Sequence, residues 1–312
     1  MNLYFAPMEG ITGYIYRNAH KEMFGMCDVY FAPFLVPTEH ERISRKTLRD
    51  ILPEKNIAVV IPQVLSGHAG AFLEFSKKIE ALGFSEVNLN LGCPSGTVVK
   101  KKRGAGALKD VEFLDSFLHD IFAETTLPIS VKTRAGFWSH EEFDELLRIF
   151  NQYPIKELMI HPRVREEYYK GIPNLQTFEK AYQGTELNLC YNGNITTVQE
   201  YREIRERYPR LHSIMIGRGA VKNPAIFREI RGGEPLKTEE LLAFFKVLEE
   251  RYLAVLESEV YTLHRMKELW LYAMDNFPEE TKILKAVKKA NRLGDLNGAV
   301  QCLPMLKKGA GV

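Results

Sequence analysis

The sequence predicts an α/β protein in which a (β/α)₈ TIM barrel is followed by a small all-helical domain. Eight short apolar segments alternate with amphipathic segments as far as about residue 230, the pattern of repeated βα units. The apolar segments are nearly continuous, as expected of parallel strands that are buried on both faces. After residue 232 only helical spacing remains. We therefore expect a barrel over residues 1–232 and a helical domain over residues 233–312.

The alternation assigns the elements in order. Strands are expected over residues 3–8, 29–35, 57–65, 86–92, 128–134, 157–161, 187–192 and 213–217. Amphipathic helices are expected over residues 71–82, 111–122, 141–150, 197–208 and 224–230, with weaker patterns over 16–24, 44–51 and 175–182. Beyond the barrel, helical spacing covers residues 237–256, 261–277 and 279–293. The 312 residues accommodate a barrel of roughly 250 residues and an appendage.

Composition excludes several classes of protein. The hydrophobic content of 45% allows a sizeable core, and the net charge of +2 gives no overall nucleic-acid signature. The cysteines Cys27, Cys93, Cys190 and Cys302 form no CxxC pair, which argues against a zinc site and a disulfide framework. The chain opens without a basic segment followed by an apolar one, and no apolar run approaches a membrane span of about 18 residues. We expect a soluble, cytoplasmic protein that binds neither metal nor membrane.

The predicted strands end in polar residues, and barrel chemistry lies at the C-terminal ends of strands. One such residue is easily explained as a helix cap or a turn residue. Packing does not account for the whole set, so we expect a site at this end of the barrel. Its members are Met8 and Glu9, Gln63, Asn90 and Cys93, Lys132 and Arg134, His161 and Arg163, Asn192 and Asn194, and Arg218.

The loop after the fourth strand has the richest chemistry. Cys93 lies in a Gly-Cys-Pro turn at the strand end, and four cations follow at residues 100–103. The small residues 104–106 allow close approach of backbone or ligand and suggest a flexible hinge. Two interpretations stay open: an acid or nucleophile beside a basic patch, or a buried structural cysteine followed by a solvated charge run.

The last two strands end in Asn192-Gly193-Asn194 and Gly217-Arg218-Gly219. In many barrels the loops at these positions bind phosphate through backbone N–H groups, a helix N-terminus and an arginine. Lys132 and Gln63 are placed to reach the ring of a flavin, where an amine stabilises the reduced anion and an amide bonds the polar edge. The alternatives are an ion pair for Lys132 and a turn role for His161.

The helical tail is locally basic. Residues 281–312 contain seven cations, namely Lys282, Lys285, Lys288, Lys289, Arg292, Lys307 and Lys308, against Asp295 alone. Lys282, Lys285 and Lys289 fall on one helical face. Such a face either contacts phosphate or is simply solvated.

Taken together, these motifs resemble the motif series of the tRNA-dihydrouridine synthases. The resemblance is in order and spans the barrel, and the tail resembles that family's RNA-binding domain. The Gly-Cys-Pro turn together with the Asn-Gly and Gly-Arg-Gly pair is specific, whereas each alone is weak. The matching segments are Ala6-Pro7-Met8-Glu9-Gly10, Asn90-Leu91-Gly92-Cys93-Pro94, Lys132-Thr133-Arg134, His161 with Arg163, Asn192-Gly193 and Gly217-Arg218-Gly219.

The resemblance implies an FMN enzyme that takes hydride from NADPH or NADH and reduces a uracil base in tRNA. Cys93 would protonate C5, for which a neutral thiol is a suitable acid. The residues implied to hold FMN are Ala6, Pro7, Met8, Gln63, Lys132, His161, Asn192, Gly193, Asn194, Gly217 and Arg218. Those implied to bind the substrate are Asn90, Lys100, Lys101, Arg134 and Arg163. Candidates for the wall around a flipped uridine are Phe34, Arg134, Arg163, Tyr168 and Tyr169.

The chain departs from the family pattern at three positions. Asn88, Asn194 and Gly13 stand where family members often have aspartate, which removes charge but leaves Cys93 and Lys132. Two other functions stay open: an FMN barrel acting on a small molecule, of the dihydroorotate dehydrogenase or enoate reductase type, and a non-catalytic RNA-binding protein. We expect a monomer, and the sequence chooses neither the uridine position nor the reductant.

Overall fold

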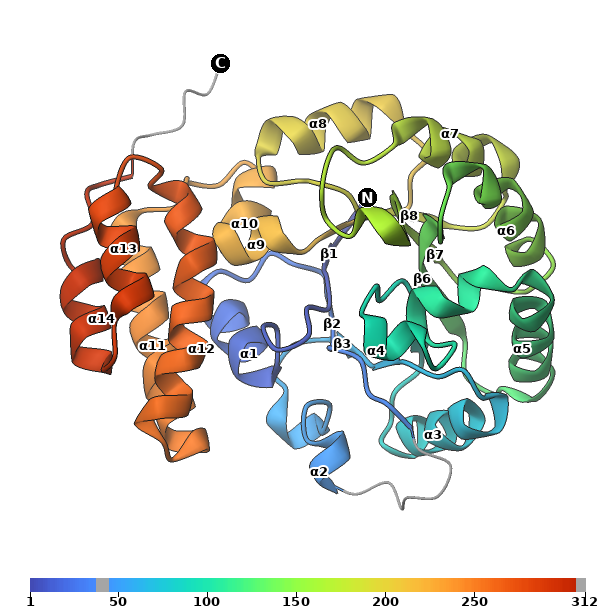
Figure 1. The fold of residues 1–312 in the computed structure, drawn as a ribbon, viewed down its shortest axis with the longest axis horizontal. Coiled ribbons are helices and arrows are strands. Elements are labelled where there is room, and N and C mark those ends of the chain that lie inside the picture. Colours follow the sequence, from blue (N-terminus) through green and yellow to red (C-terminus); the bar gives the residue numbers. More distant parts are fainter. Residues whose placement is uncertain (38–44, 307–312) are drawn as a thin grey trace.

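The computed structural model describes residues 1–37 and 45–306, in which parallel strands form a barrel surrounded by helices (Figure 1). The strands are hydrogen-bonded in the order β3-β2-β1-β9-β8-β7-β6-β5-β4, and every pairing is parallel. The predicted fold class is therefore confirmed. The strands are β1 (Asn2–Phe5), β2 (Val29–Phe31), β3 (Val60–Ile61), β4 (Gln63–Val64), β5 (Val87–Leu91), β6 (Ile129–Gly136), β7 (Leu158–Val164), β8 (Leu189–Tyr191) and β9 (Ser213–Ile216).

Within the described residues, nine strands replace the expected eight, because Pro62 divides the segment 57–65. Proline has no N–H to donate, so the ladder is interrupted there. The half before it, β3, pairs with β2, and the half after it, β4, pairs with β5. A bridge between Leu35 and Val64 joins the two sides. The first and last strands of the sheet are thus consecutive in the chain, and the barrel closes.

The barrel helices lie where the apolar spacing places them. They are α1 (Tyr14–Met23), α2 (Arg45–Leu48), α3 (Ala69–Ala81), α5 (Val111–Glu124), α6 (Phe143–Phe150), α7 (Leu175–Gly184), α8 (Val198–Arg207) and α10 (Ile226–Ile230). Ser44, the first residue of the expected helix 44–51, lies outside the described residues. Short elements were not predicted, because a single turn has no detectable periodicity. Within the described residues they include α4 (Gly96–Val99), α9 (Arg218–Lys222) and the 3₁₀ helices η1 (Pro53–Lys55), η2 (Gly104–Lys109) and η4 (Arg165–Glu167).

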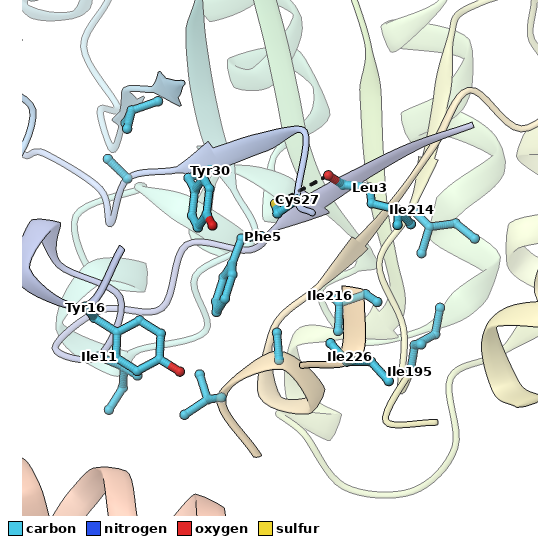
Figure 2. Close-up of a cluster of buried hydrophobic side chains, with 14 of the residues drawn as sticks. Leu3, Phe5, Ile11, Tyr16, Cys27, Tyr30, Ile195, Ile214, Ile216 and Ile226 are labelled. Atoms are coloured by element: carbon cyan, nitrogen blue, oxygen red, sulfur yellow. Dashed lines mark hydrogen bonds between the residues drawn. The ribbon is translucent and has the colours of Figure 1, made fainter. Parts of the chain in front are cut away.

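The core has two layers because neighbouring strand residues point to opposite faces. Tyr4 and Ala6 point into the barrel with Phe31, Met159, Cys190 and Met215. Leu3 and Phe5 point outward and pack beneath the helices. Figure 2 shows this outer layer, where residues of β1 and β9 meet Tyr16 of α1 and Ile226 of α10.

The C-terminal helices gather on one side of the barrel (Figure 1). They are α11 (Thr238–Leu256), α12 (Glu259–Ala273), the 3₁₀ helix η5 (Met274–Asn276), α13 (Thr281–Lys289) and α14 (Leu293–Val300). Sequence reasoning did not predict α14, which contains two glycines. The division at residues 232 and 233 stays a prediction. Within residues 1–37 and 45–306, no helix has both the length and the apolar character that crossing a bilayer requires.

The helical region shares the hydrophobic core of the barrel. The Phe244 ring of α11 lies 5.4 Å from the ring of Tyr16 in α1 and 5.2 Å from the ring of Phe24, which follows α1 directly. Asn276 donates to the carbonyl of Lys222 in α9 at 2.7 Å, and Arg265 of α12 donates to the carbonyl of Gly10. These contacts fix α12 beside the mouth of the barrel.

Candidate active site

A cavity of about 620 Å³ opens at the C-terminal ends of the strands, and its size is that of a cofactor or drug-sized ligand. Lys100 and Lys101 lie outside its wall and are exposed, and Arg163 is fully buried beneath a loop. The other predicted site residues line the cavity: Ala6, Pro7, Met8, Gln63, Asn90, Cys93, Lys132, Arg134, His161, Asn192, Gly193, Asn194, Gly217 and Arg218.

Side-chain amides connect the barrel interior to the Cys93 turn. Asn90 donates to Gln63 Oε1 at 2.7 Å, and Gln63 donates to Asn88 Oδ1 at 2.7 Å. Asn88 donates to Ser130 at 2.9 Å, and Ser130 donates to the Glu86 carboxylate at 2.5 Å. Because Glu86 only accepts, it fixes which way each amide points. The chain of bonds leaves Asn90 Oδ1 free to face the turn.

The Cys93 turn is held by hydrogen bonds on both sides. Asn90 Oδ1 accepts from the N–H groups of Gly92 at 3.0 Å and Cys93 at 2.9 Å. Arg134 Nε donates to the Gly92 carbonyl at 2.8 Å, and Arg165 Nε donates to the Pro94 carbonyl at 3.1 Å. Sequence reasoning missed Arg165, which lies four residues beyond the expected end of its strand. Its position two residues after Arg163 was the available signal.

The Cys93 thiol is partly exposed to the cavity, and burial raises its pKa despite a backbone hydrogen bond at Ser95 and the nearby Arg134 charge. The thiol is therefore protonated at neutral pH. The side chains of Lys100 to Lys102 are exposed, and Lys102 pairs with Asp110 at 3.0 Å. An uncharged thiol at a cavity wall is equipped to donate a proton.

The expected flexible hinge at residues 104–106 is instead a buried 3₁₀ turn. The reason is close approach of backbones: a Cβ on Gly104 would lie 2.8 Å from the Cys93 carbonyl oxygen, and one on Gly106 would lie 2.6 Å from that of Val99. Gly104 also has a φ of +54°, which favours glycine. The turn therefore supports Cys93 from behind.

Lys132 of β6 has no ion-pair or hydrogen-bond partner for its amine within the described part of the chain. Burial, aided by the Arg134 charge, lowers its pKa to about 8. The ion pair that was the alternative interpretation is not present among those residues. An unpaired amine inside a cavity is a counter-charge for a ligand that becomes anionic.

The ends of β8 and β9 form a site for an anion. The N–H groups of Gly193, Arg218 and Gly219 donate to no backbone carbonyl within residues 1–37 and 45–306, and all three residues line the cavity. Arg218 donates to Asn194 Oδ1 at 2.8 Å, which holds the guanidinium at the rim. Free N–H groups and a cation together suit a phosphate.

Arg163 and Arg134 hold the loop after β7 rather than pointing into open space. Arg163 donates to the carbonyls of Lys170 at 2.9 Å and Gly171 at 2.5 Å, and Arg134 donates to that of Tyr168 at 2.8 Å. Arg163 Nη1 also donates to His161 Nε2 at 2.8 Å, so the ring proton of His161 resides on Nδ1. Burial and the surrounding arginines and Lys132 lower the His161 pKa well below its ordinary value.

This loop places Tyr169 at the mouth. Its ring lies 5.3 Å from the Arg134 guanidinium and 5.2 Å from that of Arg218. Tyr169 and Phe34 line the cavity, whereas Tyr168 does not. Sequence reasoning missed the opposite wall, which the helical region supplies through Glu268, Tyr272 and Asp275. No pattern within α12 or η5 distinguishes these three residues from solvated ones.

The departure at Gly13 is compensated by a distant residue. Gly13 precedes α1 and has no side chain to cap it. Asp50 instead accepts from the Tyr14 N–H at 2.7 Å and pairs with the buried Arg17 at 2.8 Å. Asn88 and Asn194 also have partners, since each accepts a hydrogen bond within the site. The neutral residues are therefore built into the structure.

Comparison with known proteins identifies the relatives of this chain. A family model described as dihydrouridine synthase (Dus) matches residues 4–301. The tRNA-dihydrouridine(16) synthase of Shigella flexneri is 27% identical over 98% of this chain and 100% of that protein. The tRNA-dihydrouridine synthase B of Pseudomonas putida is 26% identical over 81% of this chain and 76% of that protein.

Among solved structures, the old yellow enzyme of Trypanosoma cruzi aligns with a TM-score of 0.54 at 10% identity. The alignment covers 75% of this chain and 89% of that one. Morphinone reductase aligns with a TM-score of 0.51 at 9% identity, over 75% of this chain and 86% of the other. At these identities the likeness shows the barrel fold alone.

Proposed function

The chain belongs to the dihydrouridine synthase family, and we propose that it reduces the 5,6 double bond of a uridine in tRNA, with FMN as cofactor and NADPH or NADH as reductant. The observation that carries the proposal is the protonated Cys93 thiol, whose turn is held by four hydrogen bonds, at a cavity that is also lined by the unpaired amine of Lys132 on the neighbouring strand. This pairing of acid and cation suits reduction of a polarised double bond.

The residues present fit FMN. The free N–H groups of Gly193 and Gly219, with Arg218, suit its phosphate. Gln63 retains one N–H beyond its bond to Asn88, and Lys132 offers an unpaired amine, which together suit the polar edge of the ring. Pro7 and Met8 of the first loop supply apolar wall. When bound, reduced FMN supplies the hydride that is added to C6 of the uracil.

Cys93 completes the reaction by giving its proton to C5, where carbanion character develops as hydride arrives at C6. The hydride forms a C–H bond at C6, and the proton forms a C–H bond at C5. The S–H bond of Cys93 breaks, and the resulting thiolate then regains a proton from solvent. Asn90 and Arg165 hold the turn, and Arg134 holds both the turn and the loop bearing Tyr169. Lys132 keeps positive charge near the electron-rich part of the cofactor.

The relatives support position 16 as the target. Those named for that position match 97–98% of this chain and so include its helical region. The relatives named synthase B match 81% and 53% of it. Because α12 supplies one wall of the cavity, the helical region helps to determine which uridine enters. We therefore place the modified uridine at position 16 and the enzyme in the cytoplasm, where it meets tRNA.

The test is to incubate the purified protein with NADPH and tRNA lacking dihydrouridine, then to map dihydrouridine by mass spectrometry. We expect product at position 16. Product at another position would contradict the positional assignment alone. Bound, reducible flavin without any product would contradict the proposed function and favour a small-molecule reductase.

A further inference from the structure

An aromatic and cationic surface lies beside the cavity, and its exposed Trp138 ring takes no part in the proposed chemistry. This Trp138 surface comprises the exposed residues Lys109, Trp138 and Tyr168 and, beneath them, the largely buried Phe137 and Arg165. The Trp138 side chain is 58% exposed, whereas Trp270 is 1% exposed. Within the described residues the indole N–H of Trp138 has no hydrogen-bond partner. None of the five residues lines the cavity.

The surface is ordered by packing and by backbone hydrogen bonds. The Trp138 ring meets the buried Phe137 ring edge-on at 4.7 Å. The Glu142 carboxylate accepts from the N–H groups of Phe137 at 2.6 Å, Trp138 at 3.1 Å and Ser139 at 3.1 Å. The loop is thus fixed with an aromatic face toward solvent, and a fixed face loses little entropy when it binds a partner.

Positive charge accompanies the exposed ring. Lys109 Nζ lies 4.2 Å from the Phe137 ring centre and 5.3 Å from that of Trp138. The neighbouring carboxylates are occupied, since Glu142 accepts three N–H groups and Glu166 pairs with Arg165 at 2.7 Å. Lys109 has no carboxylate partner in the ranges that the structure describes. A cation that no carboxylate neutralises, beside an exposed aromatic face, is the pairing that binds single-stranded nucleic acid.

The surface is continuous with the active site through Arg165. Its guanidinium lies 5.3 Å from the Phe137 ring and 4.8 Å from the Tyr168 ring, while its Nε donates to the carbonyl of Pro94 beside Cys93. A nucleotide adjacent to one held at Cys93 therefore comes close to this surface. Extruding a base from a stack also leaves its neighbour without a stacking partner.

We propose that the Trp138 surface binds the nucleotide next to the target uridine, with its base stacked on the Trp138 indole and its phosphate beside Lys109. This inference rests on the proposed function, because it takes tRNA to be the substrate. It assigns to the loop after β6 a role in holding the opened strand while the uridine occupies the cavity.

Tryptophan fluorescence tests the proposal directly, since the chain has two tryptophans and one of them is buried. With oxidised flavin bound, unmodified tRNA is expected to protect the emission from acrylamide quenching. Trp138→Phe should abolish that protection, because Trp270 is shielded already. This readout measures binding and is independent of turnover.

Kinetics provide the second readout. Trp138→Ala should raise the KM for tRNA by about 10-fold or more, as expected for loss of one stacked base, while Trp138→Tyr retains most of the affinity. Flavin content and the rate of flavin reduction by NADPH should match the unsubstituted protein in both variants. Lys109→Gln should reduce the salt dependence of tRNA binding by about one phosphate contact.

The outcomes separate this inference from the proposed function. Dihydrouridine formation with no protection of Trp138 and an unchanged KM in Trp138→Ala would overturn the inference and leave the function standing. Protection that depends on protein concentration and not on tRNA would show a second copy covering the surface, and would also overturn it. Failure of the wild-type protein to form dihydrouridine, despite reducible flavin, would instead contradict the function.

Discussion

The Cys93 thiol and the Lys132 amine respond to burial in the same physical way, because burial favours the uncharged form of each. The thiol pKa rises, so Cys93 keeps its proton. The amine pKa falls to about 8, so Lys132 is close to losing its charge under ordinary conditions. Cys93 thus stays in the protonated form that can act as an acid, whereas the charge of Lys132 depends on pH near its pKa of about 8.

Replacing Cys93 tests its role as the acid. Cys93→Ala should lower dihydrouridine formation by about 100-fold or more, the usual contribution of a general acid, with flavin binding retained. Cys302→Ser is the matched control, because that thiol is exposed at the end of the chain and should be neutral in the assay. Normal product formation by Cys93→Ala would remove Cys93 from the mechanism.

The lowered pKa of Lys132 predicts the pH above which activity falls. Its charge is present below about pH 8 and is lost as pH rises through that value. Flavin reduction by NADPH should therefore slow above about pH 8. In Lys132→Arg the charge persists, so the step near pH 8 should disappear even if the overall rate is lower. A pH profile that is identical in the two proteins would show that another group sets the limit.

The raised pKa of Glu157 predicts how the free energy of unfolding depends on pH. Its carboxylate lies inside the barrel, bonded by Ser213 and by Tyr4 at 3.0 Å, and burial raises its pKa to about 7. The folded state therefore holds a proton that the unfolded state releases near pH 4.5, and stability should fall as pH rises from there to about 7. The free energy of unfolding should fall by at most roughly 3 kcal/mol over this range.

Denaturant unfolding between pH 4.5 and pH 8 measures this effect. Glu157→Gln carries no titrating carboxyl and should show a flatter dependence than the unsubstituted protein. Equal slopes for the two proteins would show that Glu157 does not titrate in this range.

At the scale of elements, the loop after β7 and the turn after β5 are one assembly. Arg134 and Arg163 hold carbonyls of residues 168–171, and Arg165 joins the loop to Pro94. Tyr168 has a φ of +52°, an uncommon conformation for a residue with a side chain. The buried Arg134, which bonds its carbonyl, maintains it.

Arg165 is accordingly expected to act as a positioning residue for Cys93. Arg165→Ala should lower kcat by about 10-fold while the KM for NADPH and the flavin content stay unchanged, since a small displacement of a reacting group is costly. Alkylation of Cys93 by iodoacetamide should become faster, because the turn is released. Arg165→Lys, which keeps a donor, should recover part of kcat. Loss of flavin in Arg165→Ala would indicate a general structural role instead.

At the scale of the whole molecule, the helical region is part of the core as well as of the site. Phe244 packs against Tyr16 and Phe24, and α12 contributes Tyr272 to the cavity. Deleting residues 233–312 would expose these rings of the barrel to water. Removal of the helical region therefore perturbs the barrel as well as any contact with tRNA.

Two kinds of change distinguish the structural role of the helical region from its role in tRNA binding. Deletion of residues 233–312 should lower Tm and weaken flavin binding. The double substitution Lys282→Glu and Lys289→Glu, at two exposed positions of α13, should leave Tm within a few degrees and weaken tRNA binding most at low salt. A truncated protein as stable as the full chain would show that the barrel is independent. Lys307 and Lys308 of the same basic stretch lie outside the described residues.

The sequence by itself determined the barrel, because strand burial and βα alternation leave a direct periodic signal. It also indicated the cavity residues, since strand ends converge in every such barrel. The expected strand 57–65 was wrong in its continuity, which Pro62 interrupts, and in its bounds, because strand structure covers only residues 60–61 and 63–64 of it. Periodicity and the position of a proline depend only on neighbours along the chain, so the sequence contains them directly.

The tertiary structure alone decided how those residues are held. Three contacts join segments that are distant in sequence. Asp50 accepts the hydrogen bond that a carboxylate at position 13 would accept, Arg165 donates to the Pro94 carbonyl, and Tyr272 lines the cavity. The direction of the pKa shifts at Cys93 and Lys132 likewise depends on burial by the folded chain. Periodicity does not encode such contacts, because they depend on three-dimensional packing rather than on spacing along the chain.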